Sequence, residues 1–226
     1  MYFFDSTYIL ILIGVIIASI ASFKVKSTYK KYAKVMSDSN ISAVEVARYI
    51  LDTSGLQDIR IERVSGDLTD HYSPKERILR LSDTTYNSRS VAAIGVAAHE
   101  CGHAIQHKTG YLPIKIRNFI VPIVNLGTSL AWPIIIIGLI FSYVFVELGI
   151  FLFSFGLIFQ LITLPVEFNA SSRALKILKN TSILNYKEIK SAKKVLSAAA
   201  MTYVAAAISS ALSLLRLVLL YGGRDD

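Results

Sequence analysis

Four long runs of apolar residues interrupt the chain, and each is close to the length that crosses a bilayer. They cover about residues 8–23, 119–145, 149–166 and 196–221. A membrane-spanning helix needs about 20 mostly apolar residues. The pattern therefore predicts an α-helical integral membrane protein with about four transmembrane helices. Basic residues follow the first run instead of preceding it, so we expect a retained anchor and not a secretion signal.

A small α+β portion is predicted between the first and second runs. Residues 41–55 carry apolar positions at helical spacing, whereas residues 59–64 and 76–82 alternate apolar with polar side chains. This order predicts a short amphipathic helix followed by two or three short strands. Asn87 or Ser88 can then cap a further helix.

The charge pattern predicts how the runs cross the membrane. The chain is 53% hydrophobic and carries a net charge of +8, and all of its 24 Lys and Arg residues except Arg216 and Arg224 lie in residues 24–118 and 167–195. Because basic loops stay in the cytoplasm, we expect these two segments inside and both chain ends and the turn at 146–148 outside. Topology and anionic lipid explain the charge, which disfavours a nucleic-acid partner.

The sequence VAAHECGHAIQH, residues 96–107, holds three of the four histidines. On a helix, His99 and His103 project from one face because they are four residues apart. A glutamate directly after the first histidine completes the H-E-x-x-H pattern, in which Zn²⁺ takes both imidazoles and Glu100 acts as general base. The apolar residues before the motif are too few to span a bilayer, so we expect a buried core helix.

A catalytic zinc site needs a third protein ligand, and Glu167 is the predicted one. It follows the third apolar run, where a carboxylate is costly unless it is paired or bound to metal. The alternative is an interfacial carboxylate paired with Arg173 or a lysine. Pro165 is expected to break the membrane helix, so that a new turn carries Glu167 at the cytosolic face. Glu188 stands among lysines and is expected to be solvated.

The remaining candidates are assigned as follows. His107 is expected to be a helix-end histidine and not a ligand. His71 lies between the predicted strands, where it either stabilises an oxyanion or satisfies a turn; both readings stay open, as do the roles of Asp70 and Tyr72. Cys101 is the one cysteine, points away from the histidine face and is expected to fill a packed helix.

These motifs resemble a known family. DHYSP, VAAHECGHAIQH and LPVEFNASSRAL, in this order beside apolar runs, are similar to the bacterial membrane-bound neutral zinc metallopeptidases, the YugP-like proteins. The resemblance implies that His99, His103 and Glu167 bind zinc and that Glu100 is the general base. Ser171 stands where the related E-x-x-A-D motif has Asp, and Ser73 is a second departure. A hydroxyl orients an imidazole less strongly than a carboxylate does.

The combined reading divides the chain into five segments. They are an N-terminal transmembrane anchor (1–23), a cytosolic zincin-like segment with the H-E-x-x-H helix (24–118), a transmembrane hairpin (119–166), a cytosolic helix carrying the third zinc ligand (167–195), and a C-terminal transmembrane helix with an outer tail (196–226).

The expected function is that of a membrane-embedded zinc metallopeptidase in the bacterial plasma membrane. It would hydrolyse peptide bonds at the cytosolic membrane surface with zinc-activated water, acting on a membrane-associated protein or peptide. The predicted strand at 76–82 could present the substrate at an edge, and the small residues of the last run mark close helix packing or a homo-oligomer face. The alternative is a non-catalytic scaffold or adaptor in which zinc only holds the cytosolic helix against the other helices. Such structural sites usually have four protein ligands, often thiolates, which disfavours it here.

Overall fold

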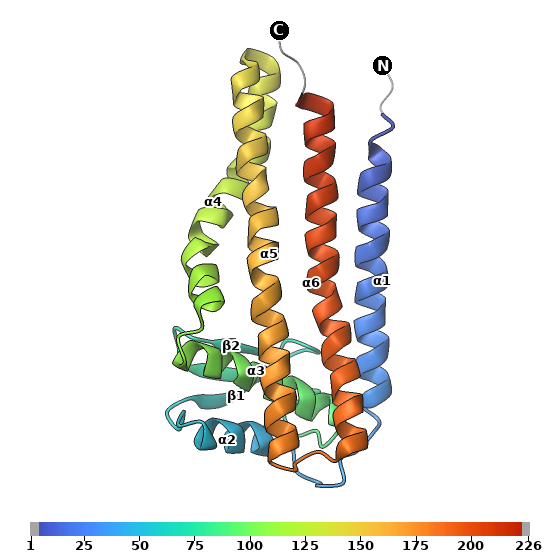
Figure 1. Cartoon of the computed structure of the whole chain (residues 1–226), viewed down its shortest axis with the longest axis vertical. Coiled ribbons are helices and arrows are strands. Elements are labelled where there is room, and N and C mark those ends of the chain that lie inside the picture. Colours follow the sequence, from blue (N-terminus) through green and yellow to red (C-terminus); the bar gives the residue numbers. More distant parts are fainter. Residues whose placement is uncertain (1–4, 223–226) are drawn as a thin grey trace. The chain divides into compact units, whose positions relative to one another are not determined.

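The computed structural model describes residues 5–222, so the predicted outer tail lies partly outside the described residues. The chain forms two compact units. We call Met1–Ser22, Lys115–Pro165 and Met201–Asp226 the span unit, and Phe23–Ile114 with Val166–Ala200 the sheet unit. The elements, in order, are α1 (Tyr8–Tyr32), α2 (Ala43–Thr53), β1 (Arg60–Val64), β2 (His71–Ser73), β3 (Ile78–Ser82), α3 (Val91–Lys108), α4 (Leu112–Phe141), α5 (Tyr143–Asn180) and α6 (Tyr186–Tyr221) (Figure 1).

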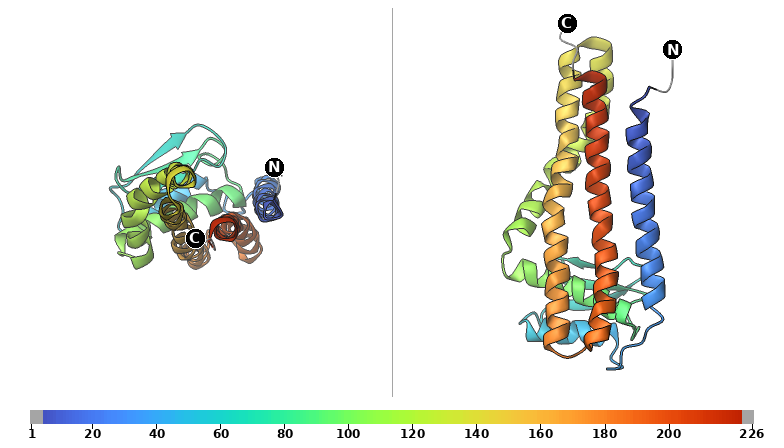
Figure 2. Two further views of the ribbon diagram at one scale, coloured as in Figure 1. Left: turned by 90° about the horizontal axis from the view of Figure 1, so that it is seen from above. Right: turned by 45° about the vertical axis from the view of Figure 1, so that its right-hand side comes forward.

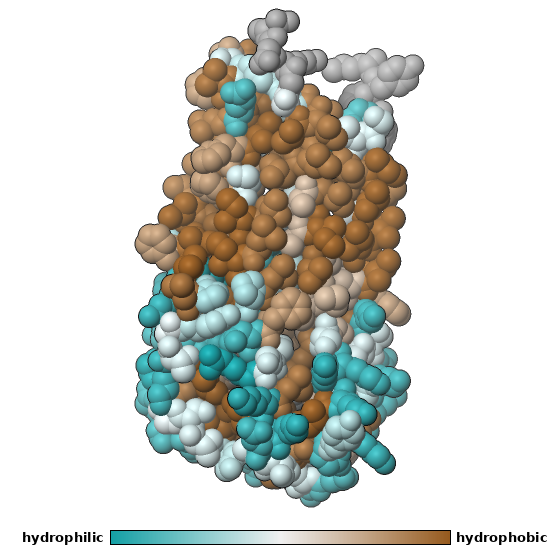
Figure 3. All heavy atoms as spheres, viewed as in Figure 1, coloured by the Kyte–Doolittle hydropathy of each residue, from teal (hydrophilic) through white to brown (hydrophobic). Residues whose placement is uncertain are grey.

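Four helices of the described residues are long and apolar enough to cross a membrane: α1, α4, α5 and α6. Their apolar side chains remain largely exposed, and Figure 3 shows the resulting hydrophobic surface over the span unit. The prediction of about four transmembrane helices is confirmed at the level of helix length and composition. The outside placement of the chain ends stays a prediction.

Small residues bring the helices of the span unit together in pairs, as Figure 2 shows for α4 with α5. A Cβ on Gly149 would lie 2.9 Å from the carbonyl oxygen of Ala131, so only glycine allows this approach. The helices separate at Ser142, and the turn predicted at 146–148 was wrong. Hydropathy located that turn at the charge of Glu147, but close packing of the two helices decides where the chain reverses.

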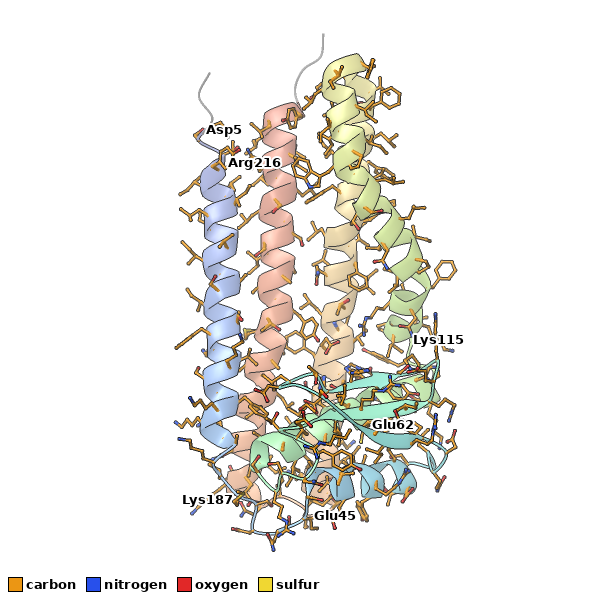
Figure 4. All side chains as sticks on the ribbon, turned by 180° about the vertical axis from the view of Figure 1, so that it is seen from behind. Asp5, Glu45, Glu62, Lys115, Lys187 and Arg216 are labelled. Atoms are coloured by element: carbon orange, nitrogen blue, oxygen red, sulfur yellow. The ribbon has the colours of Figure 1, made fainter. Side chains whose placement is uncertain are left out.

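An ion pair joins α1 to α6 in the same unit. Asp5 and Arg216 lie beside each other in Figure 4, with Arg216 Nη2 donating to Asp5 Oδ2 at 3.2 Å. Ser209 Oγ also donates to the carbonyl of Gly14 at 3.0 Å. The buried guanidinium thus has an acidic partner at the helix end, which reduces the cost of removing its charge from water.

Pro165 lies inside α5, so the predicted helix break at this residue was wrong. A proline removes one backbone hydrogen bond from a helix. Beyond it, every fourth residue of α5 is fully buried: Val166, Ala170, Ala174 and Leu178. This stripe lies on one helix face, and its packing keeps the helix continuous through the proline.

The sheet unit is built on a three-stranded sheet in the order β1-β3-β2, with β1 parallel and β2 antiparallel to β3. The strand predicted at 76–82, which was expected to offer an edge to a substrate, therefore lies at the centre of the sheet. The edge strand β2 contacts α3. Ser42 and Glu45 form a capping box at the start of α2, near the Glu45 label of Figure 4. One hydrophobic cluster joins α2, the sheet, α3 and the sheet-unit parts of α5 and α6.

Candidate metal centre

The two motif histidines lie one turn apart on α3. Ser90 caps this helix by accepting a hydrogen bond from the amide of Ala93, so the predicted caps Asn87 and Ser88 were wrong by a few residues. The Nε2 atoms of His99 and His103 are 3.2 Å apart, and the two rings meet edge to face. Both nitrogens therefore point at the same place beside the helix.

Glu167 of α5 brings its carboxylate to that place. Its Oε2 lies 3.3 Å from Nε2 of His99 and 3.5 Å from Nε2 of His103, and the residue is only 3% exposed. The three side chains form a group able to hold a metal ion. With Zn–ligand bonds of about 2.0–2.2 Å, two donor atoms of a tetrahedral zinc lie about 3.3–3.6 Å apart. The observed triangle thus has the size of one face of a zinc tetrahedron.

Gln106 orients His103, a role that no pattern in the sequence indicates. Gln106 is fully buried, and its amide nitrogen donates to the carbonyl of Val166 at 2.7 Å and to Oδ1 of Asn169 at 3.0 Å. These two bonds direct its Oε1 to Nδ1 of His103 at 3.0 Å. Because that oxygen only accepts, Nδ1 carries the proton and Nε2 keeps a lone pair for a metal. Arg173 extends the chain of hydrogen bonds by donating to Asn169.

Ser171 supports His99 in the same way. Its Oγ lies 3.1 Å from Nδ1 of His99. The hydroxyl can accept the Nδ1 proton and so leave Nε2 free to bind a metal. The serine that replaces the aspartate of the related motif therefore does contact the metal-ligand histidine, although without a carboxylate's charge.

A glycine between the histidines sets the distance from α3 to α5. A Cβ on Gly102 would lie 2.7 Å from the carbonyl oxygen of Ala170, which is part of the α5 backbone. Ala170 is three residues from Glu167, so this contact fixes how close the carboxylate comes to the imidazoles. The sequence signal for this contact is the glycine itself. Glycine is less favourable than alanine inside a helix, so its presence at this position indicates a close approach of another element.

Glu100 lies next to the donor triangle and is half-buried. The backbone N–H of Tyr72, on edge strand β2, donates to its Oε2 at 3.1 Å. Burial raises the pKa of Glu100, and the nearby histidines oppose that rise. A carboxylate whose pKa is raised is a stronger base than an ordinary one.

The structure places the other candidates away from the triangle. His71 is exposed, with Nδ1 2.9 Å from the carbonyl of Thr69, which fits the turn reading. His107 lies in the last turn of α3 as predicted, 3.3 Å from the hydroxyl of Tyr72. Asp70 accepts from the backbone and side chain of Ser82, so it holds the strands together.

Two further assignments differ in outcome. Cys101 is buried beside the carbonyl of Ala47, in agreement with a packing role, and burial raises the pKa of its thiol. Glu188 is 6% exposed and accepts from the backbone N–H groups of Asp38 and Asn185, both at 2.7 Å. The prediction of a solvated Glu188 was therefore wrong, since it caps α6 and joins it to the loop after α1.

The described residues contain four candidate spans, and two histidines of an H-E-x-x-H helix meet a glutamate of α5. These features define the class as a membrane metalloprotein of the zinc-peptidase type. The chain belongs to the family described as "Putative neutral zinc metallopeptidase", which matches residues 7–222. It is 49% identical over 209 residues to "Putative membrane protease YugP" of Bacillus subtilis (strain 168), covering 91% of this chain and 92% of that relative. No solved structure matches the chain. The family resemblance and the choice of zinc are confirmed.

Proposed function

We propose that this protein is a membrane-embedded endopeptidase that hydrolyses peptide bonds at the cytosolic membrane surface. The observation that carries the proposal is the donor triangle of His99, His103 and Glu167, with sides of 3.2, 3.3 and 3.5 Å and Glu100 directly beside it. These three residues would hold zinc. When bound there, zinc supplies Lewis-acid chemistry, activating water and polarising the peptide carbonyl.

The protein's own groups then have separate tasks. Gln106 and Ser171 keep the two imidazoles in the tautomer that leaves Nε2 available. Glu100 takes a proton from the attacking water and returns it to the leaving amine. Its raised pKa matches this double task, because the same group must be a base in one step and an acid in the next.

Edge strand β2 is suited to present an extended substrate. Tyr72 and Leu79 face each other in the antiparallel pair, and the N–H of Tyr72 points to Glu100 instead of β3. In an antiparallel strand the N–H and C=O of one residue point to the same side. A substrate that adds a strand to β2 would bond to the backbone of Tyr72. It would also displace Glu100 from that N–H and free the carboxylate for catalysis.

The proposal is tested with Glu100→Gln in the purified full-length protein. We expect the variant to keep its zinc and to lose hydrolysis of fluorescein-labelled casein and of a quenched peptide library by several orders of magnitude. Glu62→Gln, a change of the same kind at a half-exposed strand residue, is the control and should remain active. Zinc-loaded protein in which Glu100→Gln matches the wild type would refute the mechanism. Zinc-loaded wild type without any peptidase activity would favour the scaffold reading.

The cytosolic placement has its own test, since Cys101 is buried and is the one native thiol. Glu147→Cys and Lys187→Cys each introduce a single accessible thiol. In intact cells, a membrane-impermeant maleimide should label Glu147→Cys, and it should label Lys187→Cys only after the cells are opened. The reverse pattern would place the metal centre on the outer side.

A further inference from the structure

A groove lies between the sheet-unit parts of α5 and α6, which run side by side (Figures 1 and 2). Its volume is about 590 Å³, within the range of ordinary ligand pockets. The three donor residues of the metal centre are not among those that line it. In Figure 3, apolar surface shows between hydrophilic side chains over this part of the molecule. The groove is thus a concave site that does not contain the donor triangle, although Ser171, the partner of His99, lies on its lining.

The lining of the groove combines an apolar floor with positive charge. Leu175 and Leu196 belong to the floor, and Lys176, Lys179 and Lys193 stand along it. No Asp or Glu is among the described residues that line the groove, and within residues 5–222 no carboxylate pairs with these three lysines. Three unpaired ammonium groups around one cavity attract an anion.

The two helices give the groove the same polarity along its length. On α5, Phe168 lies nearest the end of the apolar run and Lys176 and Lys179 lie farther from it. On α6, Ala200 lies within the apolar run and Lys193 lies before it. An amphiphile has the same order, with an apolar part followed by a charged part. An acidic peptide would not require an apolar lining at the end of the groove nearest the apolar runs of α5 and α6.

We propose that this groove binds an anionic phospholipid, with the phosphate among the three lysines and the start of an acyl chain along Phe168 and Ala200. Lys193 is within reach of a leaflet surface. Lys193 is about 10 Å along α6 from Ala200 at about 1.5 Å per residue. The headgroup region is about 5–8 Å thick on each side of the hydrocarbon, and a lysine stem covers the remaining distance by snorkelling.

The test measures lipid binding by the full-length protein in neutral detergent, with short-chain phosphatidylglycerol and short-chain phosphatidylcholine as probes. We expect retention of phosphatidylglycerol in native mass spectra and a preference of at least about tenfold over phosphatidylcholine. The combined change Lys176→Gln, Lys179→Gln and Lys193→Gln should abolish that preference. A matched variant changes three exposed lysines of α6 outside the groove, Lys187, Lys190 and Lys194, to Gln; it removes the same charge and should keep the preference.

A second pair of variants fills the groove without changing charge. Ser197→Trp, on the rim, should block lipid binding, and Ser191→Trp, on the same helix outside the groove, should not. Equal binding of the two lipids, or equal loss in both triple variants, would overturn the proposal. Full competition by glycerol 3-phosphate would assign the site to a soluble phosphate ester instead, and competition by an acidic peptide would assign it to a peptide. None of these outcomes depends on peptidase activity.

Discussion

Replacing Gly102 by alanine would place a methyl group against the backbone of α5. The added Cβ would lie 2.7 Å from the carbonyl oxygen of Ala170 and 3.2 Å from its carbonyl carbon and Cα. Carbon and oxygen atoms in close contact are normally about 3.3–3.6 Å apart. The helices must therefore separate by about 0.6–0.9 Å at this point, because neither backbone can rotate away.

The structure gives the size of the effect by comparison with a second glycine of α3. A Cβ on Gly95 would lie 3.5 Å from the Cβ of Ala192, which is ordinary contact. Both substitutions gain the same helix propensity, about 1 kcal/mol. Their difference therefore isolates the clash, for which overpacking costs about 1–3 kcal/mol. In a chain of this length the melting temperatures of Gly102→Ala and Gly95→Ala should differ by about 2–12 °C.

Zinc content is the more sensitive measurement. Metal–ligand distances tolerate only about 0.2 Å, less than the expected displacement of the helix that carries Glu167. Purified Gly102→Ala should bind zinc at least about tenfold more weakly than wild type in a chelator competition, whereas Gly95→Ala should bind it normally. If Gly102→Ala keeps wild-type zinc affinity and melts with Gly95→Ala, the approach of α3 to α5 does not set the geometry of the centre.

Three smaller changes test other contacts. Gln106→Leu removes the acceptor of the His103 proton and should lower zinc affinity by about 10–100-fold; an unchanged affinity in chelator competition would show that the amide does not orient the ring. Glu188→Ala leaves two backbone N–H groups without their acceptor and should lower the free energy of unfolding by about 2 kcal/mol or more, measured by thermal melting in detergent, where an unchanged melt would contradict a capping role. Asp5→Asn should lower the melting temperature because it removes the acidic partner of Arg216, which is 9% exposed; adding Arg216→Met should recover part of that loss, and a strictly additive double variant would argue against the pair.

The local pattern of the sequence indicated the apolar helices, although not all of their ends, and it singled out the three residues that the structure brings together. Four-residue spacing placed His99 and His103 on one helix face, and the position of Glu167 after an apolar run singled it out. Both inferences use a single element at a time. The periodicity of a helix is encoded in neighbouring residues, so it can be read without knowing what the helix packs against.

Contacts between elements that are distant in sequence could not be predicted from local patterns. Gln106 looks like an ordinary polar residue near a helix end, and its role depends on Val166 and Asn169, which lie 60 and 63 residues away in sequence. Glu188 among lysines has the composition of a solvated face, yet it accepts from the amide of Asp38, 150 residues away. Pro165 likewise predicts a helix end from local rules alone, whereas the packing of the buried stripe that follows it depends on other elements.

Metal binding and folding of the sheet unit depend on the same contacts. The Ala170 backbone would meet a Cβ on Gly102, Val166 accepts from Gln106, and Ser171 contacts His99, so these three contacts between α3 and α5 also orient the zinc ligands. A ligand that binds only the folded chain stabilises it in proportion to RT ln(1 + [L]/Kd), about 4 kcal/mol at a thousandfold excess over Kd. The donor residues come from two helices that meet only when the unit is folded. Zinc bound there would therefore stabilise the packing of α3 on α5. A substitution that loosens this packing should weaken zinc binding to the extent that it moves the donor atoms.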